Sequence, residues 1–128
     1  MGHTTLVFRD RDDYFNDADV LVVLHMLIAK ARSQPDRAWQ HPELIPSWEN
    51  ALDTTGPGFV DVSFNELSDA ARTYVVELLR ELQTDLKDKD AVPERSVGNW
   101  RVPDLILGDD YDAARVRDTL ERLTRLLS

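Results

Sequence analysis

The stretch VLVVLHMLIA, residues 20–29, is apolar around almost its whole circumference when it is drawn as a helix. Such a helix needs other elements packed against most of its sides. The sequence therefore predicts a helix that is buried on most sides. The run of strand-favouring residues at 20–23 also fits a buried strand, which remains the alternative.

Polar residues flank this stretch as they flank a helix. Asn16 or Asp17 can cap the free N–H groups at its start, and Lys30 and Arg32 lie where the helix dipole favours cations. These flanks predict a helix that ends near Ser33.

Two further helices follow from apolar residues at three- and four-residue steps. The first is expected at 68–87 and the second at 113–127, opened by Asp109 or Asp110. The apolar positions of the first are Ala71, Tyr74, Val75, Leu78, Leu79, Leu82 and Leu86, and those of the second are Ala113, Val116, Leu120, Leu123 and Leu127. Both faces are expected to point into the core.

Shorter elements fill the rest of the chain. A short helix is expected at 46–54, because Pro46 suits a first helical position. Strands are favoured at 4–9 and 59–64, and a tight hairpin at 96–103. We therefore predict an α+β, mostly helical fold: one domain, residues 1–128, of about three to four helices with a minor sheet of short strands.

Composition limits the class of protein. Of the 128 residues, 42% are hydrophobic and 30% charged, which is typical of a globular domain, and there is no cysteine for a disulfide or a thiolate ligand. No N-terminal signal peptide is recognisable, and the apolar run of about ten residues is shorter than the roughly twenty that a membrane span needs. We expect a cytoplasmic protein that does not enter membranes.

The charge is strongly negative and concentrated in two places. The net charge is −9; residues 10–19 hold five aspartates with Arg11 as the only base, and residues 104–112 hold four aspartates and no base. Direct nucleic-acid binding is disfavoured, because phosphates require Lys and Arg. A basic protein partner would instead be attracted.

Two apolar stretches end in these clusters: LVFRDRDD at 6–13 and LILGDDYD at 105–112. This pattern resembles the phosphatase group of the haloacid dehalogenase-like fold. The resemblance implies a carboxylate nucleophile and a bound Mg²⁺ that neutralises phosphate charge.

The resemblance would assign Asp10 as nucleophile and Asp12 as acid/base, with Asp109 and either Asp110 or Asp112 on the metal. Several observations oppose it. Arg9 interrupts the strand before the nucleophile, and the chain is too short to supply the strand–helix units of a parallel sheet beside these helices.

Other catalytic or metal-binding patterns are missing from the sequence. His3, His25 and His41 have no paired metal-ligand spacing, and an EF-hand loop starting at Asp10 would need Gly where Phe15 stands. There is no glycine-rich phosphate loop and no nucleophile elbow. We therefore expect no enzyme activity and no cofactor, and we interpret His25 as a core residue.

The acidic clusters are then candidates for a partner-binding surface, together with two tryptophans in predicted loops. Tryptophan is enriched among the residues that contribute most to interface affinity. The candidate partner-binding residues are Asp10, Asp12, Asp13, Asp17, Trp39, Trp100, Asp109, Asp110 and Asp112.

Three functional hypotheses follow. The first is a non-enzymatic acidic binding module, similar in composition to the bacterial immunity proteins that neutralise toxins, with a basic protein as partner. The second is a small helical regulatory or antitoxin-like dimer that uses the 113–127 face between chains, so monomer and homodimer both stay open. The third is a metal-dependent phosphohydrolase that uses the Asp clusters.

Overall fold

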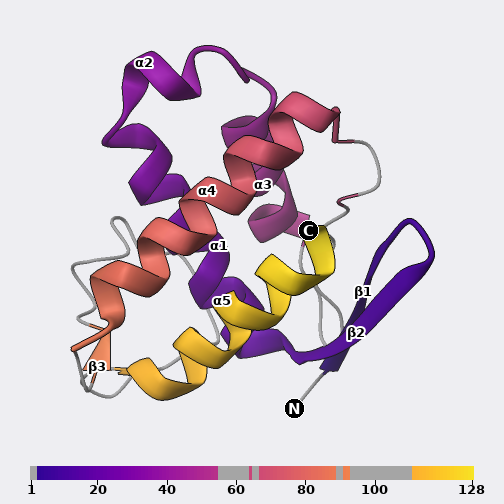
Figure 1. Cartoon of the computed structure of the whole chain (residues 1–128), viewed down its shortest axis with the longest axis vertical. Coiled ribbons are helices and arrows are strands. Elements are labelled where there is room, and N and C mark those ends of the chain that lie inside the picture. Colours follow the sequence, from indigo (N-terminus) through magenta and orange to yellow (C-terminus); the bar gives the residue numbers. More distant parts are fainter. Residues whose placement is uncertain (1–2, 55–63, 65–66, 89–90, 93–110) are drawn as a thin grey trace.

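The structure is a computed structural model that describes residues 3–54, 64, 67–88, 91–92 and 111–128. Helices dominate the described part of the chain, which confirms the mostly helical α+β class (Figure 1). The helices are α1 (Asp17–Arg32), α2 (Pro35–Ala38), α3 (Leu44–Thr54), α4 (Asp69–Leu86) and α5 (Ala113–Leu127). The strands are β1 (His3–Phe8), β2 (Arg11–Asn16), β3 (Ala91–Val92) and β4 (Tyr111–Asp112). The short α2 is the helix that raises the number above the expected three to four.

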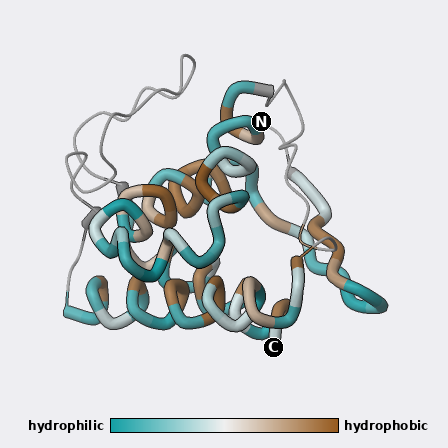
Figure 2. Tube along the Cα trace, turned by 90° about the horizontal axis from the view of Figure 1, so that it is seen from above, coloured by the Kyte–Doolittle hydropathy of each residue, from teal (hydrophilic) through white to brown (hydrophobic). Residues whose placement is uncertain are grey.

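Helix α1 is the centre of the fold. Every residue from Asp19 to Ile28 is buried, and the helix contacts α2, α3, α4 and α5. The tube coloured by hydropathy shows hydrophobic segments gathered where the helices face one another (Figure 2). The side chain of Asn16 accepts a hydrogen bond from the backbone N–H of Ala18, which confirms a predicted cap. Residues 20–23 are therefore helical, and the strand alternative is wrong.

Helices α4 and α5 run antiparallel and pack against each other (Figure 1). All the apolar positions predicted to point inward on these two helices are buried. Ser68 caps α4 by accepting from the N–H of Ala71. The predicted start of α5 is wrong: its N-cap is Asp112, which accepts from the N–H of Ala114 at 2.9 Å. Any of the clustered aspartates has the side chain for a cap, so residue type alone did not select among them.

Helix α3 covers one side of α1. It begins at Leu44, slightly before the predicted start, and Pro46 lies in its first turn, where a missing N–H costs nothing. Trp48 and Ala51 are buried, and Leu52 packs against the core as expected.

The N-terminal strands form an antiparallel hairpin in which the pair Phe8–Arg11 closes the turn Arg9–Asp10. The first strand was predicted. The second was not, because residues 10–19 were interpreted as a solvated loop and a helix cap. Arg9 has a φ of 58°, in the left-handed region that tight hairpin turns require.

Some predictions lie outside the described residues. These are the hairpin at 96–103 and the strand at 59–64, apart from Phe64, which is buried. None of the described helices is both long and apolar enough to span a bilayer.

Candidate protein-binding surface

The β1–β2 hairpin has two chemically different faces. Because side chains alternate along a strand, directly opposite residues share a face. The inner face carries Leu6, Phe8 and Phe15, each no more than 5% exposed. The outer face, defined here as Thr5, Val7, Asp12 and Tyr14, consists of exposed residues, with Val7 opposite Asp12 and Thr5 opposite Tyr14.

An ion pair fixes the inner face to α5. The guanidinium of Arg122 donates to both carboxylate oxygens of Asp13, from Nε at 3.1 Å and from Nη2 at 2.7 Å. Nη2 also donates to the backbone carbonyl of Tyr14, and the guanidinium lies 4.5 Å from the centre of the Phe15 ring. The hydrogen bond from Arg122 is the main reason that the pKa of Asp13 is lowered, and the same bond raises the pKa of Arg122.

Further contacts continue this pairing along α5 in the antiparallel direction. The guanidinium of Arg11 donates to the carbonyl of Arg125 at 3.2 Å, and Arg115 forms an ion pair of 3.2 Å with Asp19, which is buried. The acidic segment 10–19 thus lies against arginines more than 90 residues away in the sequence. Part of its charge is therefore balanced inside the fold.

The remaining negative charge lies on and beside the outer face. Asp12 is on that face and Asp10 is in the turn, both exposed, and neither forms an ion pair with the described part of the chain. Asp17 instead accepts a hydrogen bond from the hydroxyl of Thr4. Val7 and Tyr14 are 42% and 59% exposed, and they are two of the three exposed large hydrophobic residues in the described regions.

The third is Trp39, which is 81% exposed at the end of α2. Figure 1 places α2 and the hairpin at opposite sides of the molecule, so Trp39 and the outer face cannot belong to one compact surface. Asp112 is also separate from the hairpin, because it caps the start of α5, about 15 Å along the helix axis from Arg122. Trp100, Asp109 and Asp110 lie outside the described residues.

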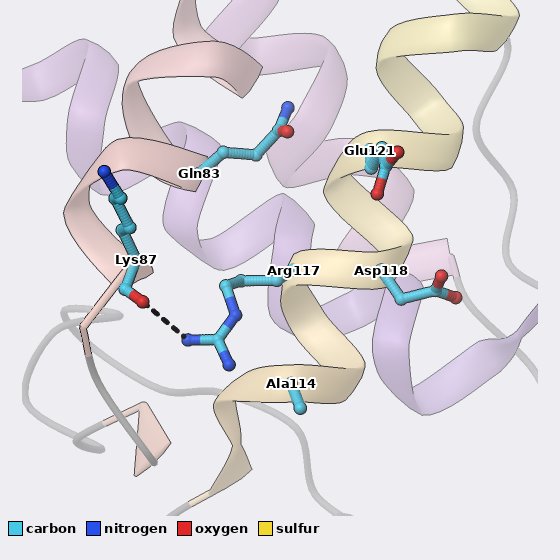
Figure 3. Close-up of a pocket in the computed structure, with 6 residues that line it drawn as sticks. All are labelled: Gln83, Lys87, Ala114, Arg117, Asp118 and Glu121. Atoms are coloured by element: carbon cyan, nitrogen blue, oxygen red, sulfur yellow. Dashed lines mark hydrogen bonds between the residues drawn. The ribbon is translucent and has the colours of Figure 1, made fainter.

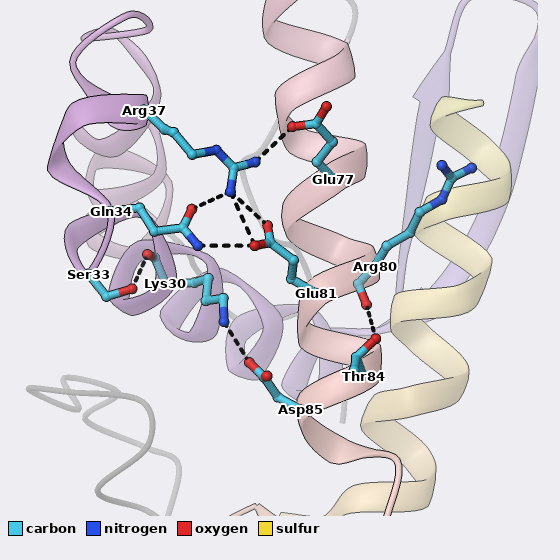
Figure 4. A network of polar contacts seen from close by, with 9 residues as sticks. All are labelled: Lys30, Ser33, Gln34, Arg37, Glu77, Arg80, Glu81, Thr84 and Asp85. Carbon is cyan, nitrogen blue, oxygen red and sulfur yellow. Dashed lines mark hydrogen bonds and ion pairs between the residues drawn. The ribbon is translucent and has the colours of Figure 1, made fainter.

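Around α2, a polar network ties the helix to α4 (Figure 4). Arg37 forms ion pairs with Glu77 at 2.7 Å and Glu81 at 3.1 Å, and its guanidinium lies 5.1 Å from the centre of the Tyr74 ring. Gln34 adds a hydrogen bond to Glu81. Burial raises the pKa of the Tyr74 hydroxyl. These side chains are engaged with one another, so the network holds α2 in place.

A shallow groove of about 490 Å³ lies between α4 and α5 (Figure 3). Its lining mixes charges of both signs: Gln83, Lys87, Ala114, Arg117, Asp118 and Glu121. Arg117 donates to the backbone carbonyl of Leu86 at 2.5 Å and so satisfies the C-terminal end of α4. The groove does not present one chemical character to a ligand.

The described residues do not have the arrangement expected of a metal-dependent phosphohydrolase. Asp10 lies in the turn of an antiparallel hairpin, whereas the resemblance to the haloacid dehalogenase-like fold implied the end of a parallel strand. No group of three or more His, Asp or Glu side chains in the described regions is arranged to hold a metal ion. His25 is buried in α1, and burial lowers its pKa.

No protein-family model, curated protein or solved structure matches the chain. The function is therefore inferred from its own surface, where the outer face of the hairpin combines exposed apolar side chains with unbalanced negative charge.

Proposed function

We propose that the protein is a non-enzymatic binding module that presents the outer face of the β1–β2 hairpin to a basic protein partner. The observation that carries this proposal is the exposure of Val7 and Tyr14 beside the carboxylates of Asp10 and Asp12. Apolar side chains supply contact area, and aromatic residues are enriched in protein interfaces. The carboxylates select for positive charge.

The inner face makes the hairpin a rigid platform. Leu6, Phe8 and Phe15 are buried in the same core as the helices, and the Asp13–Arg122 pair ties β2 to α5. A surface that is already ordered loses less conformational entropy on binding. The hairpin therefore favours binding without a large rearrangement.

The charge of the whole chain supports the same kind of partner. A net charge of −9 attracts a basic protein over long range and accelerates encounter. The exposed carboxylates of the hairpin are the groups that would then contact it. An immunity or inhibitor-type protein that neutralises a basic toxin fits this description.

The regulatory or antitoxin-like dimer has less support. Its proposed interface was the 113–127 face, but Leu120 and Leu123 on that face are buried within the chain. Dimerisation through this face would require α5 to leave α4.

The test begins with the partner retained by the immobilised chain from a lysate of its source organism. Association of that partner is then measured at low and high salt. We expect the double variant Asp10→Asn/Asp12→Asn to slow association and to flatten its salt dependence, because rim charges act mainly on association rate. Asp13 and Asp17 are left unchanged, since they make contacts within the fold.

A matched control carries the same change in charge on another surface. Asp36 is exposed on α2 and Glu43 is exposed just before α3, and Asp36→Asn/Glu43→Gln should reduce association much less. If both double variants slow association equally, only the total charge matters and the hairpin is not the binding surface.

A further inference from the structure

We propose that the outer face of the hairpin is a receptor for one arginine side chain of the partner, stacked on the Tyr14 ring and paired with the Asp12 carboxylate. This inference rests on the proposed function and specifies the chemistry of the group that the surface binds. It is carried by a similar pairing of a carboxylate and an aromatic ring, Asp13 with Phe15, which holds an arginine on the opposite side of the same strand.

The inner face of β2 shows how this strand holds an arginine. Asp13 and Phe15 are two residues apart and therefore share a face. The guanidinium of Arg122 fills the space between them, 2.7 Å from the Asp13 carboxylate and 4.5 Å from the centre of the Phe15 ring. A carboxylate followed two residues later by an aromatic ring thus accommodates one guanidinium.

The outer face of β2 repeats this pattern one residue earlier. Asp12 and Tyr14 are also two residues apart, and their Cα atoms are separated by about 7 Å, as same-face neighbours on a strand are. Asp12 is exposed and forms no ion pair with the described residues, and the Tyr14 side chain is 59% exposed. The groups that hold Arg122 inside the fold therefore have counterparts that face outward.

The cross-strand neighbours of Asp12 and Tyr14 are small and uncharged. Val7 lies opposite Asp12 and Thr5 lies opposite Tyr14, and both are smaller than the aromatic ring. Neither carries a charge that would compete for the Asp12 carboxylate. The aliphatic part of an arginine can cover Val7, which removes apolar surface from water.

The same chemistry occurs a second time in the chain, on a helix. Arg37 lies over the Tyr74 ring at 5.1 Å while it pairs with Glu77 and Glu81. An aromatic ring beside a carboxylate therefore holds an arginine in this protein twice, Phe15 with Asp13 on a strand and Tyr74 with Glu77 and Glu81 on a helix.

Arginine is expected in preference to lysine. Its planar guanidinium can stack on an aromatic ring and pair with a carboxylate through two parallel N–H groups, whereas the ammonium of lysine is a compact and more strongly hydrated charge. The energy of an exposed cation–π contact corresponds to about a two- to fivefold change in affinity.

The experiment uses two short peptides as probes, one of alternating Thr and Arg and one of alternating Thr and Lys, with equal length and charge. Binding to the full chain is followed by NMR titration of the backbone amides at low salt. We expect the arginine peptide to bind about two- to fivefold more tightly and to shift the amide signals of Asp12 and Tyr14.

Two variants separate the contributions. Tyr14→Leu keeps an apolar side chain but removes the ring, so it should abolish the preference for arginine and weaken the lysine peptide much less than the arginine peptide. Asp12→Asn should weaken both peptides. The control Asp36→Asn, on the distant α2, should preserve the arginine preference.

The outcomes distinguish this inference from the proposed function. Equal affinity of the two peptides, with shifts still on the hairpin, overturns the arginine site and leaves an acidic binding surface. No measurable binding of either peptide also overturns the arginine site. Shifts confined to another surface, unchanged by Asp12→Asn, count against both the arginine site and the hairpin as the partner-binding surface.

Discussion

Asp12 and Asp13 are neighbours in the sequence but have different surroundings, because they lie on opposite faces of β2. The Asp13 carboxylate is held by Arg122 of α5, and the aromatic residue that shares its face, Phe15, is 1% exposed. The Asp12 carboxylate faces outward beside Tyr14, which is 59% exposed. The inner face of the strand thus contributes to the stability of the fold, and the outer face is the one that we propose for binding.

The largest difference in stability between variants of the two faces should come from their aromatic residues, Phe15 and Tyr14. Phe15→Ala is expected to lower the free energy of unfolding by about 3–5 kcal/mol, because it removes a fully buried ring and leaves a cavity. Tyr14→Leu should change it by less than about 0.5 kcal/mol, since the ring is largely in solvent. Urea unfolding of both variants measures the difference.

If instead Tyr14→Leu destabilises the protein as much as Phe15→Ala, then Tyr14 supports the fold. Its exposure would then give no reason to assign it to a partner, and the arginine site would lose its aromatic half.

A smaller loss of stability is expected when Arg122, which pairs with the inner face, is replaced. Arg122→Ala should cost about 1–2 kcal/mol, because it removes a half-buried ion pair and a cation–π contact with Phe15. Arg80 on α4 is an exposed arginine without an ion pair in the described part of the chain, so Arg80→Ala serves as the control and should have little effect. Equal losses in the two variants would mean that the Arg122 pair contributes nothing specific.

The stability from Asp13 should depend on pH with a definite sign. Arg122 lowers the pKa of Asp13 below its ordinary value of 3.8, so the contribution is present above that value and is lost as the pH falls through the folded-state pKa. Asp13→Asn should therefore destabilise the protein at neutral pH, by an amount that stays constant down to about pH 5 and shrinks below about pH 4. Thermal unfolding over this range tests it; a difference that grows in acid would contradict the assignment.

Helices α1, α3, α4 and α5 were predictable because each is encoded by its own residues. The apolar spacing of α4 and α5 is periodic over several turns, and the all-round apolar surface of α1 implies burial wherever the helix packs. The precise cap of α5 was less predictable, since several aspartates precede it and each can accept the same hydrogen bond.

Strand β2 was missed for a physical reason. Its sequence RDDYFN places Asp13 on the buried face, where simple alternation expects an apolar residue. That position is tolerated only because Arg122, 109 residues later, supplies the opposite charge. The signal lay in α5, where Arg115 and Arg122 recur one heptad apart beside the apolar face, but sequence alone does not show which acidic residues they meet.

The candidate site was also only partly predictable, because the sequence does not show which residues meet in the fold. The cluster at 10–19 was identified from its charge, but the division between Asp13, which is balanced within the fold, and Asp12, which is not, depends on the side of the strand. The exposed apolar residues Val7 and Tyr14 were not predicted as surface residues, because each belongs to a stretch that also supplies the core.

The smallest change in stability is expected from Asp12→Asn, which makes the same substitution as Asp13→Asn one residue away and on the other face of β2. Asp12→Asn removes a carboxylate that has no cationic partner in the described part of the chain and that lies near Asp10 and Asp13. Loss of that repulsion should leave the free energy of unfolding unchanged or slightly higher at low salt, and added salt should remove any gain, because exposed charges are screened within about 8–10 Å. Asp13→Asn, with the same loss of one negative charge, should lower stability at every salt concentration, since its pair with Arg122 also consists of directed hydrogen bonds.

Chemical unfolding of the two variants at low and high salt measures this difference in stability. If Asp12→Asn lowers stability as Asp13→Asn does, the outer carboxylate is a structural residue, and the hairpin has no face reserved for a partner.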